Sequence, residues 1–219
     1  MKFAVAILAV LAMASPLSAY KLPASGSGAL AKELQDVVDL VPFEKIIPII
    51  KAYAAQDKEV QVALKVLQSS ELKLFVSDVE AIPAVKNLVK YMQNAGLDMV
   101  SLMNKMNDIL GLGHISALDE FDLKISGGIA GLGKDILDVL PQQTIEQVYE
   151  EKRKNSKVFG DLVHELLKPE LVKVYLSLLS NKHYVKLVQE AELAKIPAVI
   201  FTSHMPLLMM SKTILALKG

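Results

Sequence analysis

One stretch of the chain has the residue spacing of a phosphate-binding loop. Gly128-Ile-Ala-Gly-Leu-Gly133-Lys134 fits the pattern G-x-x-x-x-G-K, and residues 121–125 before it have the composition of a strand. Such a loop needs Ser or Thr after the Lys to hold magnesium. Asp135 stands there instead, and its negative charge would repel phosphate groups. We therefore interpret the segment as a hinge and helix start, not as a nucleotide site.

The histidines offer little for metal chemistry. His164-Glu165 begins like a zinc-protease motif, but position 168 is Lys, so the second histidine ligand at i+4 is missing. The other three, His114, His183 and His204, form no pair with ligand spacing. We expect all four to be surface or partly buried polar groups, and we expect no metal and no cofactor.

Candidate nucleophiles and paired carboxylates are also weak. Ser126 precedes two glycines but lacks the G-x-S-x-G elbow that exposes a hydrolase nucleophile. The pairs Asp36/Asp39 and Asp135/Asp138 each lie three residues apart, which places both carboxylates on one face of a helix. Just before a proline, that face is expected to stay solvated. The sequence predicts no catalytic residue and no enzyme.

The first 19 residues read as a secretory signal peptide. One Lys precedes an apolar run from Ala4 to Ala14, which is too short to span a bilayer as a helix. Cleavage is expected after Ala19, with Ala14 as a second possibility and a retained anchor as the alternative. The mature protein is then expected to be secreted.

Composition limits the partners. The chain has 24 basic and 24 acidic residues, which gives no electrostatic basis for binding nucleic acid. It has no Cys, so a secreted form must be held together by its core alone. Hydrophobic residues make up 52% but aromatic residues only 5%, with nine Met. Such a mixture suits either a helical core or the lining of a site for flexible apolar ligands.

The chain reads as one unit written twice. Asp36-Val-Val-Asp-Leu-Val-Pro42 recurs as Asp135-Ile-Leu-Asp-Val-Leu-Pro141, 99 residues later, and apolar positions match in the same frame without a gap. We infer a duplication of about 100 residues per copy. The expected organisation is one domain of two repeats: signal peptide 1–19, N-terminal lead 20–28, repeat one 29–113, connector 114–126 and repeat two 127–219.

Periodic apolar residues, with Pro, Gly and N-cap residues at the breaks, predict an all-α chain with about six helices per copy. Proline ends the first helix of each copy, and Gly96 is expected to supply a left-handed cap. The expected helices cover residues 29–41, 43–55, 58–68, 71–79, 84–94 and 99–110 in the first copy. In the second they cover 127–140, 142–154, 156–167, 169–179, 182–194 and a segment from 197 onward, with a partly helical connector around 117–121.

Five segments of repeat one carry a resemblance to a known family: residues 36–42, 59–68, 85–92, Ala95-Gly-Leu-Asp98 and 104–111. These segments resemble the insect allergen-related repeat family, which includes cockroach midgut allergens and mosquito midgut proteins. The resemblance covers residues 30–219 and is weaker in repeat two, where Lys195-Ile-Pro197 replaces the Gly-Leu-Asp cap. It implies about twelve helices wrapped into a capsule around a large apolar cavity that holds fatty acids or phospholipid acyl chains nonspecifically.

The leading hypothesis is therefore a secreted midgut lipid-binding and lipid-transfer protein, located in the gut lumen or at the microvillar surface. It is expected to be a monomer that makes transient contact with membranes. A membrane-active effector that extracts lipid, and a structural microvillus-associated protein without ligand, are the alternatives. The lining is predicted to be Ile46, Ile50, Leu64, Leu67, Phe75, Leu88, Met92, Leu102 and Met106 in repeat one, with Ile145, Tyr149, Val163, Leu166, Leu187, Phe201 and Met205 in repeat two.

Overall fold

The computed structural model describes residues 21–111, 123–194 and 196, with the backbone alone over 106–111. Within these ranges the chain is all-α, as predicted, and its only bridge between extended residues joins Ala24 to Leu97. The helices are α2 (Ala29–Val38), α3 (Phe43–Gln56), α4 (Lys58–Leu67), α5 (Ser70–Ala81), α6 (Pro83–Asn94), α7 (Met99–Gly111), α8 (Gly128–Val139), α9 (Gln142–Asn155), α10 (Lys157–Leu166), α11 (Pro169–Leu178) and α12 (Lys182–Leu193). None of these helices is long and apolar enough to cross a membrane. The predicted connector helix and the segment from 197 onward lie outside the described residues.

The helix bounds follow the repeat offset. α3 begins at Phe43 and α9 at Gln142, a separation of 99 residues, and the starts of α2 and α8, α4 and α10, α5 and α11, and α6 and α12 are separated equally. The breaks repeat as well. Pro42 precedes α3 with φ −78° and ψ 73°, and Pro141 precedes α9 with φ −77° and ψ 68°. The same local chemistry therefore sets the same backbone path in both halves.

Side-chain caps explain several helix starts. The carboxylate of Asp57 accepts a hydrogen bond from the N–H of Val60 at the start of α4, and the hydroxyl of Ser156 accepts one from Phe159 at the start of α10. Ser69 caps α5 in the same way. Each cap satisfies a donor that has no partner within its own helix. These helices consequently begin where the sequence predicts, within a residue.

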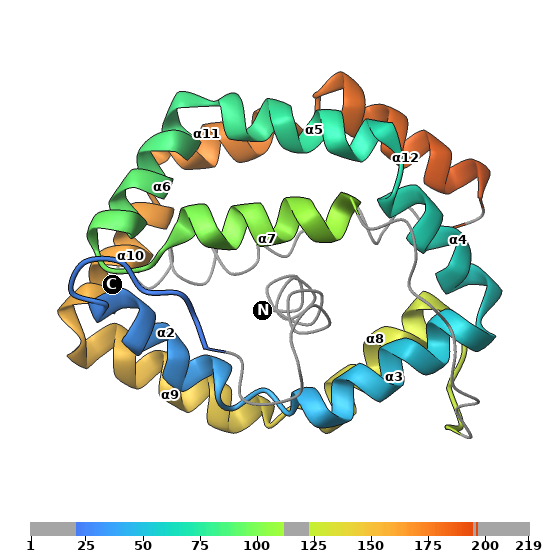
Figure 1. Ribbon diagram of the computed structural model, residues 1–219, viewed down its shortest axis with the longest axis horizontal. Helices are drawn as coiled ribbons and strands as arrows, with labels where there is room; N and C mark the ends of the chain where they lie inside the picture. The colour runs from blue at the N-terminus through green and yellow to red at the C-terminus, as the bar shows by residue number, and fades with distance from the viewer. Residues whose placement is uncertain (1–20, 112–122, 195, 197–219) are drawn as a thin grey trace.

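Contacts between the two repeats are reciprocal. α3 packs on α8 while α2 packs on α9, and α5 packs on α12 while α11 packs on α6. In Figure 1 the helices follow one another around a ring, with α7 crossing its middle. Each repeat therefore contacts the other through equivalent helices. This is the geometry of a pseudo-two-fold dimer within one chain.

Buried side chains in the described part of the chain gather in at least four clusters, and half-buried residues such as Ile129 and Ile136 each pack against two of them. A domain usually has one contiguous core. Here the fully buried residues gather where neighbouring helices of the ring meet. The clusters centre on Leu30, Ala31, Leu97 and Leu162; on Val66, Leu187, Ala191 and Ile196; on Val41 and Ile46; and on Ile49, Tyr53 and Val60.

The segment before α2 is held to the turn between α6 and α7. The N–H of Ser25 donates to the carbonyl of Gly96, the Ser25 hydroxyl donates to the carbonyl of Gln93, and the N–H of Asp98 donates to the carbonyl of Pro23. Gly96 has φ +104°, a left-handed conformation that ends α6 as the sequence predicts. The lead is thus fixed to the first repeat through this turn.

Candidate functional site

Three helices carry complete apolar stripes that remain partly exposed. On α5 the stripe is Leu72, Phe75, Val76 and Val79; on α6 it is Val85, Leu88, Val89 and Met92; on α11 it is Leu171, Val174, Tyr175 and Leu178. Each stripe follows the i, i+3, i+4, i+7 spacing that normally faces a core. Yet all of these side chains are only half-buried, and none of the three helices contains a fully buried residue. The stripes are a candidate surface for an apolar ligand.

The predicted lining residues fall into three groups by exposure. Ile46, Ile145 and Leu187 are buried between helices. Leu67 and Leu166, related by the repeat, are 41% and 43% exposed. Half-buried positions are Ile50, Leu64, Phe75, Leu88, Met92, Leu102, Tyr149 and Val163. The side chain of Met106, and residues Phe201 and Met205, lie outside what the structure describes. Whether these residues line a cavity stays a prediction.

The glycine-rich stretch is built for packing and not for phosphate. The backbone N–H of Gly128, which a phosphate loop would use, donates to the carboxylate of Asp57 at 2.6 Å. Lys134 is paired with Asp138 one turn on. A Cβ on Gly131 would lie 2.9 Å from the hydroxyl oxygen of Tyr53, so this glycine lets α8 approach α3 closely. Its donors and its lysine are therefore engaged within the protein.

The first aspartate of each repeated pair joins its repeat to the other. Asp135 on α8 accepts a 2.6 Å hydrogen bond from the hydroxyl of Tyr53 on α3, whose side chain is fully buried, and also binds Ser126. Its counterpart Asp36 on α2 forms a 2.6 Å ion pair with Lys152 on α9. Tyr53 and Lys152 are themselves counterparts, 99 residues apart. The prediction that these carboxylates only keep a helix face wet missed this pairing.

These contacts also shift ionisation. Hydrogen bonds from Ser126 and Tyr53 hold the pKa of Asp135 below its ordinary value. Burial and the hydrogen bond with Asp135 raise the pKa of Tyr53. Burial lowers the pKa of Lys152, but its hydrogen bonds with Asp36 and Glu33 more than offset this and raise it. All three contacts thus favour the charge states present at neutral pH.

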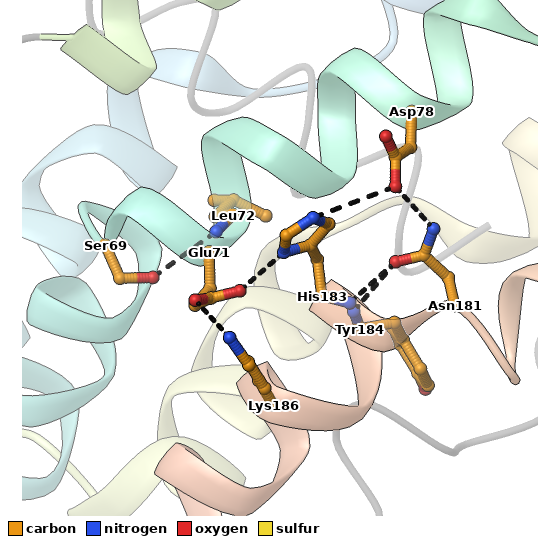
Figure 2. A network of polar contacts seen from close by, with 8 residues as sticks. All are labelled: Ser69, Glu71, Leu72, Asp78, Asn181, His183, Tyr184 and Lys186. Carbon is orange, nitrogen blue, oxygen red and sulfur yellow. Dashed lines mark hydrogen bonds and ion pairs between the residues drawn. The ribbon is translucent and has the colours of Figure 1, made fainter.

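A second polar cluster joins α5 to α12 (Figure 2). Nδ1 of His183 lies 2.6 Å from a carboxylate oxygen of Glu71, and its Nε2 lies 4.0 Å from Asp78. The ammonium of Lys186 binds the other oxygen of Glu71 at 3.1 Å, and Asn181 donates to Asp78. His183 is buried, with 8% of its surface exposed, whereas the sequence predicted a surface or partly buried group. Hydrogen bonds from His183 and Lys186 hold the pKa of Glu71 below its ordinary value.

The equivalent seam between α6 and α11 has no such cluster. Ala84 stands where α12 has His183, and Ile82 where it has Asn181. Ser177 replaces Asp78, so Glu170, the counterpart of Glu71, has no histidine opposite. The two seams thus share a backbone arrangement but differ in polar contacts, and neither α6 nor α11 contains a buried residue.

Acid should loosen the contacts between repeats. Glu71 and Asp135 have lowered pKa values in the folded chain, so their stabilising contribution is present above the ordinary carboxyl pKa of about 4 and is lost as pH falls through the folded values. We expect the free energy of unfolding, from urea titrations, to be flat above about pH 5 and to fall below it. Glu71→Gln with Asp135→Asn should flatten the fall. Asp138→Asn, at an exposed position on α8, is the control and should keep the wild-type profile.

The sequence analysis noted Asp135 and His183 but not the residues that they contact, Tyr53 and Glu71. The recurrence of Asp36 as Asp135 was visible, but its partner sits on a helix of the other repeat. Among residues 21–105, 123–194 and 196, no three His, Cys, Asp or Glu side chains are placed to hold a metal ion.

The fold and the exposed apolar stripes define a class: an all-helical protein made of two reciprocal repeats. Residues 29–200 match the family described as insect allergen related repeat, nitrile-specifier detoxification, and the chain belongs to this family. It is 30% identical over 169 residues to "Protein G12" of Anopheles gambiae, covering 76% of this chain and 78% of that protein. The resemblance drawn from the sequence is thereby confirmed.

Proposed function

We propose that this protein is a secreted midgut carrier of fatty acids or phospholipid acyl chains. The apolar stripes of α5, α6 and α11 bind these acyl chains without chemical selectivity. One observation carries the proposal: each of these helices has a complete apolar stripe and not one fully buried residue. Apolar stripes of this width normally form a core. Leu72, Phe75 and Met92 also pack against buried clusters, but all three stripes stay partly exposed, which favours an apolar ligand as a further partner.

The energetics suit acyl chains. Burying one CH₂ group contributes roughly 0.8 kcal/mol, so a long chain needs no polar recognition to be held firmly. Leu and Val make up nine of the twelve stripe side chains, with Met92 among the rest, and branched and thioether side chains adapt to ligands of different shape. The buried residues gather in clusters between neighbouring helices, with half-buried side chains linking some of them, which agrees with a wall of helices around a space, the capsule implied by the family resemblance.

Lipid extraction tests the proposal. The secreted protein is purified, extracted with organic solvent, and the extract is analysed by mass spectrometry beside a delipidated sample. We expect at least about one acyl chain per protein, and its recovery when the delipidated protein meets fatty acid, because an acyl chain would cover the part of the stripes that stays exposed. A clean extract with no uptake on later exposure would instead mean that the stripes are covered within the protein, and would leave the structural alternative.

A further inference from the structure

The turn between α11 and α12 carries exposed apolar side chains that repeat one lacks. Leu176 is 51% exposed, Leu179 is 40% and Val185 is 39%. At the equivalent positions repeat one has Ser77, Glu80 and Lys86. Because the two halves share one backbone plan, the polar residues show what a solvated version of this surface looks like. The apolar replacements are therefore specific to repeat two.

These three side chains lie within ten residues of one another, on either side of the α11–α12 turn. Leu176 and Leu179 are three residues apart at the end of α11, on one helix face, and Val185 lies in the first turns of α12. Figure 1 shows the α11–α12 connection at the outer edge of the ring. We call Leu176, Leu179 and Val185, with Lys173 and Lys182, the α11–α12 tip.

The chain segment at the tip carries basic residues only, while Asp78 of α5 lies beside it and accepts a hydrogen bond from Asn181 in the α11–α12 turn. Residues 171–189 contain Lys173, Lys182 and Lys186 and no Asp or Glu, whereas the equivalent residues 72–90 contain Asp78 and Glu80. Lys186 is occupied by Glu71, but Lys173 and Lys182 make no ion pair with any residue that the structure describes. Apolar side chains beside unpaired lysines match the two layers of an anionic lipid surface, headgroup charge above hydrocarbon.

We propose that the α11–α12 tip docks on anionic membranes, with Leu176, Leu179 and Val185 entering the acyl region and Lys173 and Lys182 at the headgroups. This surface is separate from the stripes that the proposed function uses. It would bring the protein to a source or recipient of lipid, but docking itself requires no bound ligand. The equivalent α5–α6 turn of repeat one, which has Ser77 and Glu80 at these positions, would not dock.

Vesicle sedimentation of the purified protein tests this. Binding to phosphatidylcholine vesicles containing phosphatidylserine should exceed binding to phosphatidylcholine alone and should weaken with salt. Replacing the tip by its repeat-one counterparts, as Leu176→Ser, Leu179→Glu and Val185→Lys, should lower the partition coefficient about tenfold or more, because three apolar contacts are lost. Val100→Ser with Leu123→Ser removes exposed apolar residues elsewhere and should bind as wild type.

The charge arm is separate. Lys173→Gln with Lys182→Gln should remove the preference for phosphatidylserine while keeping the fold. Unchanged binding of the triple variant overturns the proposal. A second result would also overturn it: a concentration-dependent dimer, seen by light scattering, that the triple variant abolishes while vesicle binding persists. The tip would then be the contact surface for a second copy of the chain.

The lipid content of each variant is measured in parallel. Wild-type protein that docks but carries no lipid would contradict the carrier function and leave the docking proposal intact.

Discussion

Replacing Gly96 by alanine is expected to lower the free energy of unfolding by about 3–5 kcal/mol. Gly96 has φ +104°, which a residue with a Cβ rarely adopts. A Cβ there would lie 2.5 Å from the backbone nitrogen of Ala29 and 2.9 Å from two backbone atoms of Gly28. Backbone cannot rotate aside as a flexible side chain can, so the start of α2 must move. Urea unfolding of delipidated protein, followed by circular dichroism, measures the change.

Gly133 supplies the matched control. It lies within α8 at a negative φ, and a Cβ there would meet nothing within 4 Å. Gly133→Ala should therefore raise stability by about 0.5–1 kcal/mol, because alanine favours the helix over glycine. If Gly96→Ala and Gly133→Ala were equally stable, the close contact between the α6–α7 turn and the start of α2 would not contribute the stability that we assign to it.

Two carboxylates at predicted lining positions should sharply reduce lipid carriage. Ile50 on α3 and Leu88 on the α6 stripe are both half-buried, and Ile50 also packs against the cluster of Val41 and Ile46. Ile50→Asp together with Leu88→Asp should cut the extracted lipid at least about tenfold, since an acyl chain cannot solvate a charge and burying one unpaired costs several kcal/mol. The measurement is lipid per protein by mass spectrometry, after circular dichroism has shown a helical, cooperatively melting chain.

The control places the same charges on exposed positions of the same two helices. Lys45→Asp with Asn87→Asp should leave the lipid content unchanged, because both residues face solvent. If the double carboxylate variant fails to fold, Leu88→Trp provides a neutral test: added bulk should reduce capacity without burying a charge. A folded double variant with a full lipid load would contradict the assignment of this surface.

The reciprocal contacts explain why one Asp of each pair matters. Asp36 and Asp135 are the same position in the two copies, and each reaches the second helix of the other copy. The chemistry of the partner differs, Lys152 against Tyr53, so one contact is an ion pair and the other a hydrogen bond to a buried phenol. Duplication preserved the geometry while the residue types diverged. The His183 cluster on one seam, and its absence from the other, shows the same divergence carried further.

The sequence alone determined the helices, their bounds and the repeat. A helix cap such as the hydrogen bond from the N–H of Val60 to Asp57 joins residues three positions apart, and Pro42 and Gly96 restrict or permit their own backbone angles. These signals are local, so the sequence predicts them directly. Tertiary structure decided which faces meet. Tyr53 and Asp135 are 82 residues apart and Glu71 and His183 are 112 apart. No local preference links such residues, because their contact depends on how whole helices of the two repeats pack. The same packing left the stripes of α5, α6 and α11 half-exposed, where periodicity by itself predicted only that they are apolar.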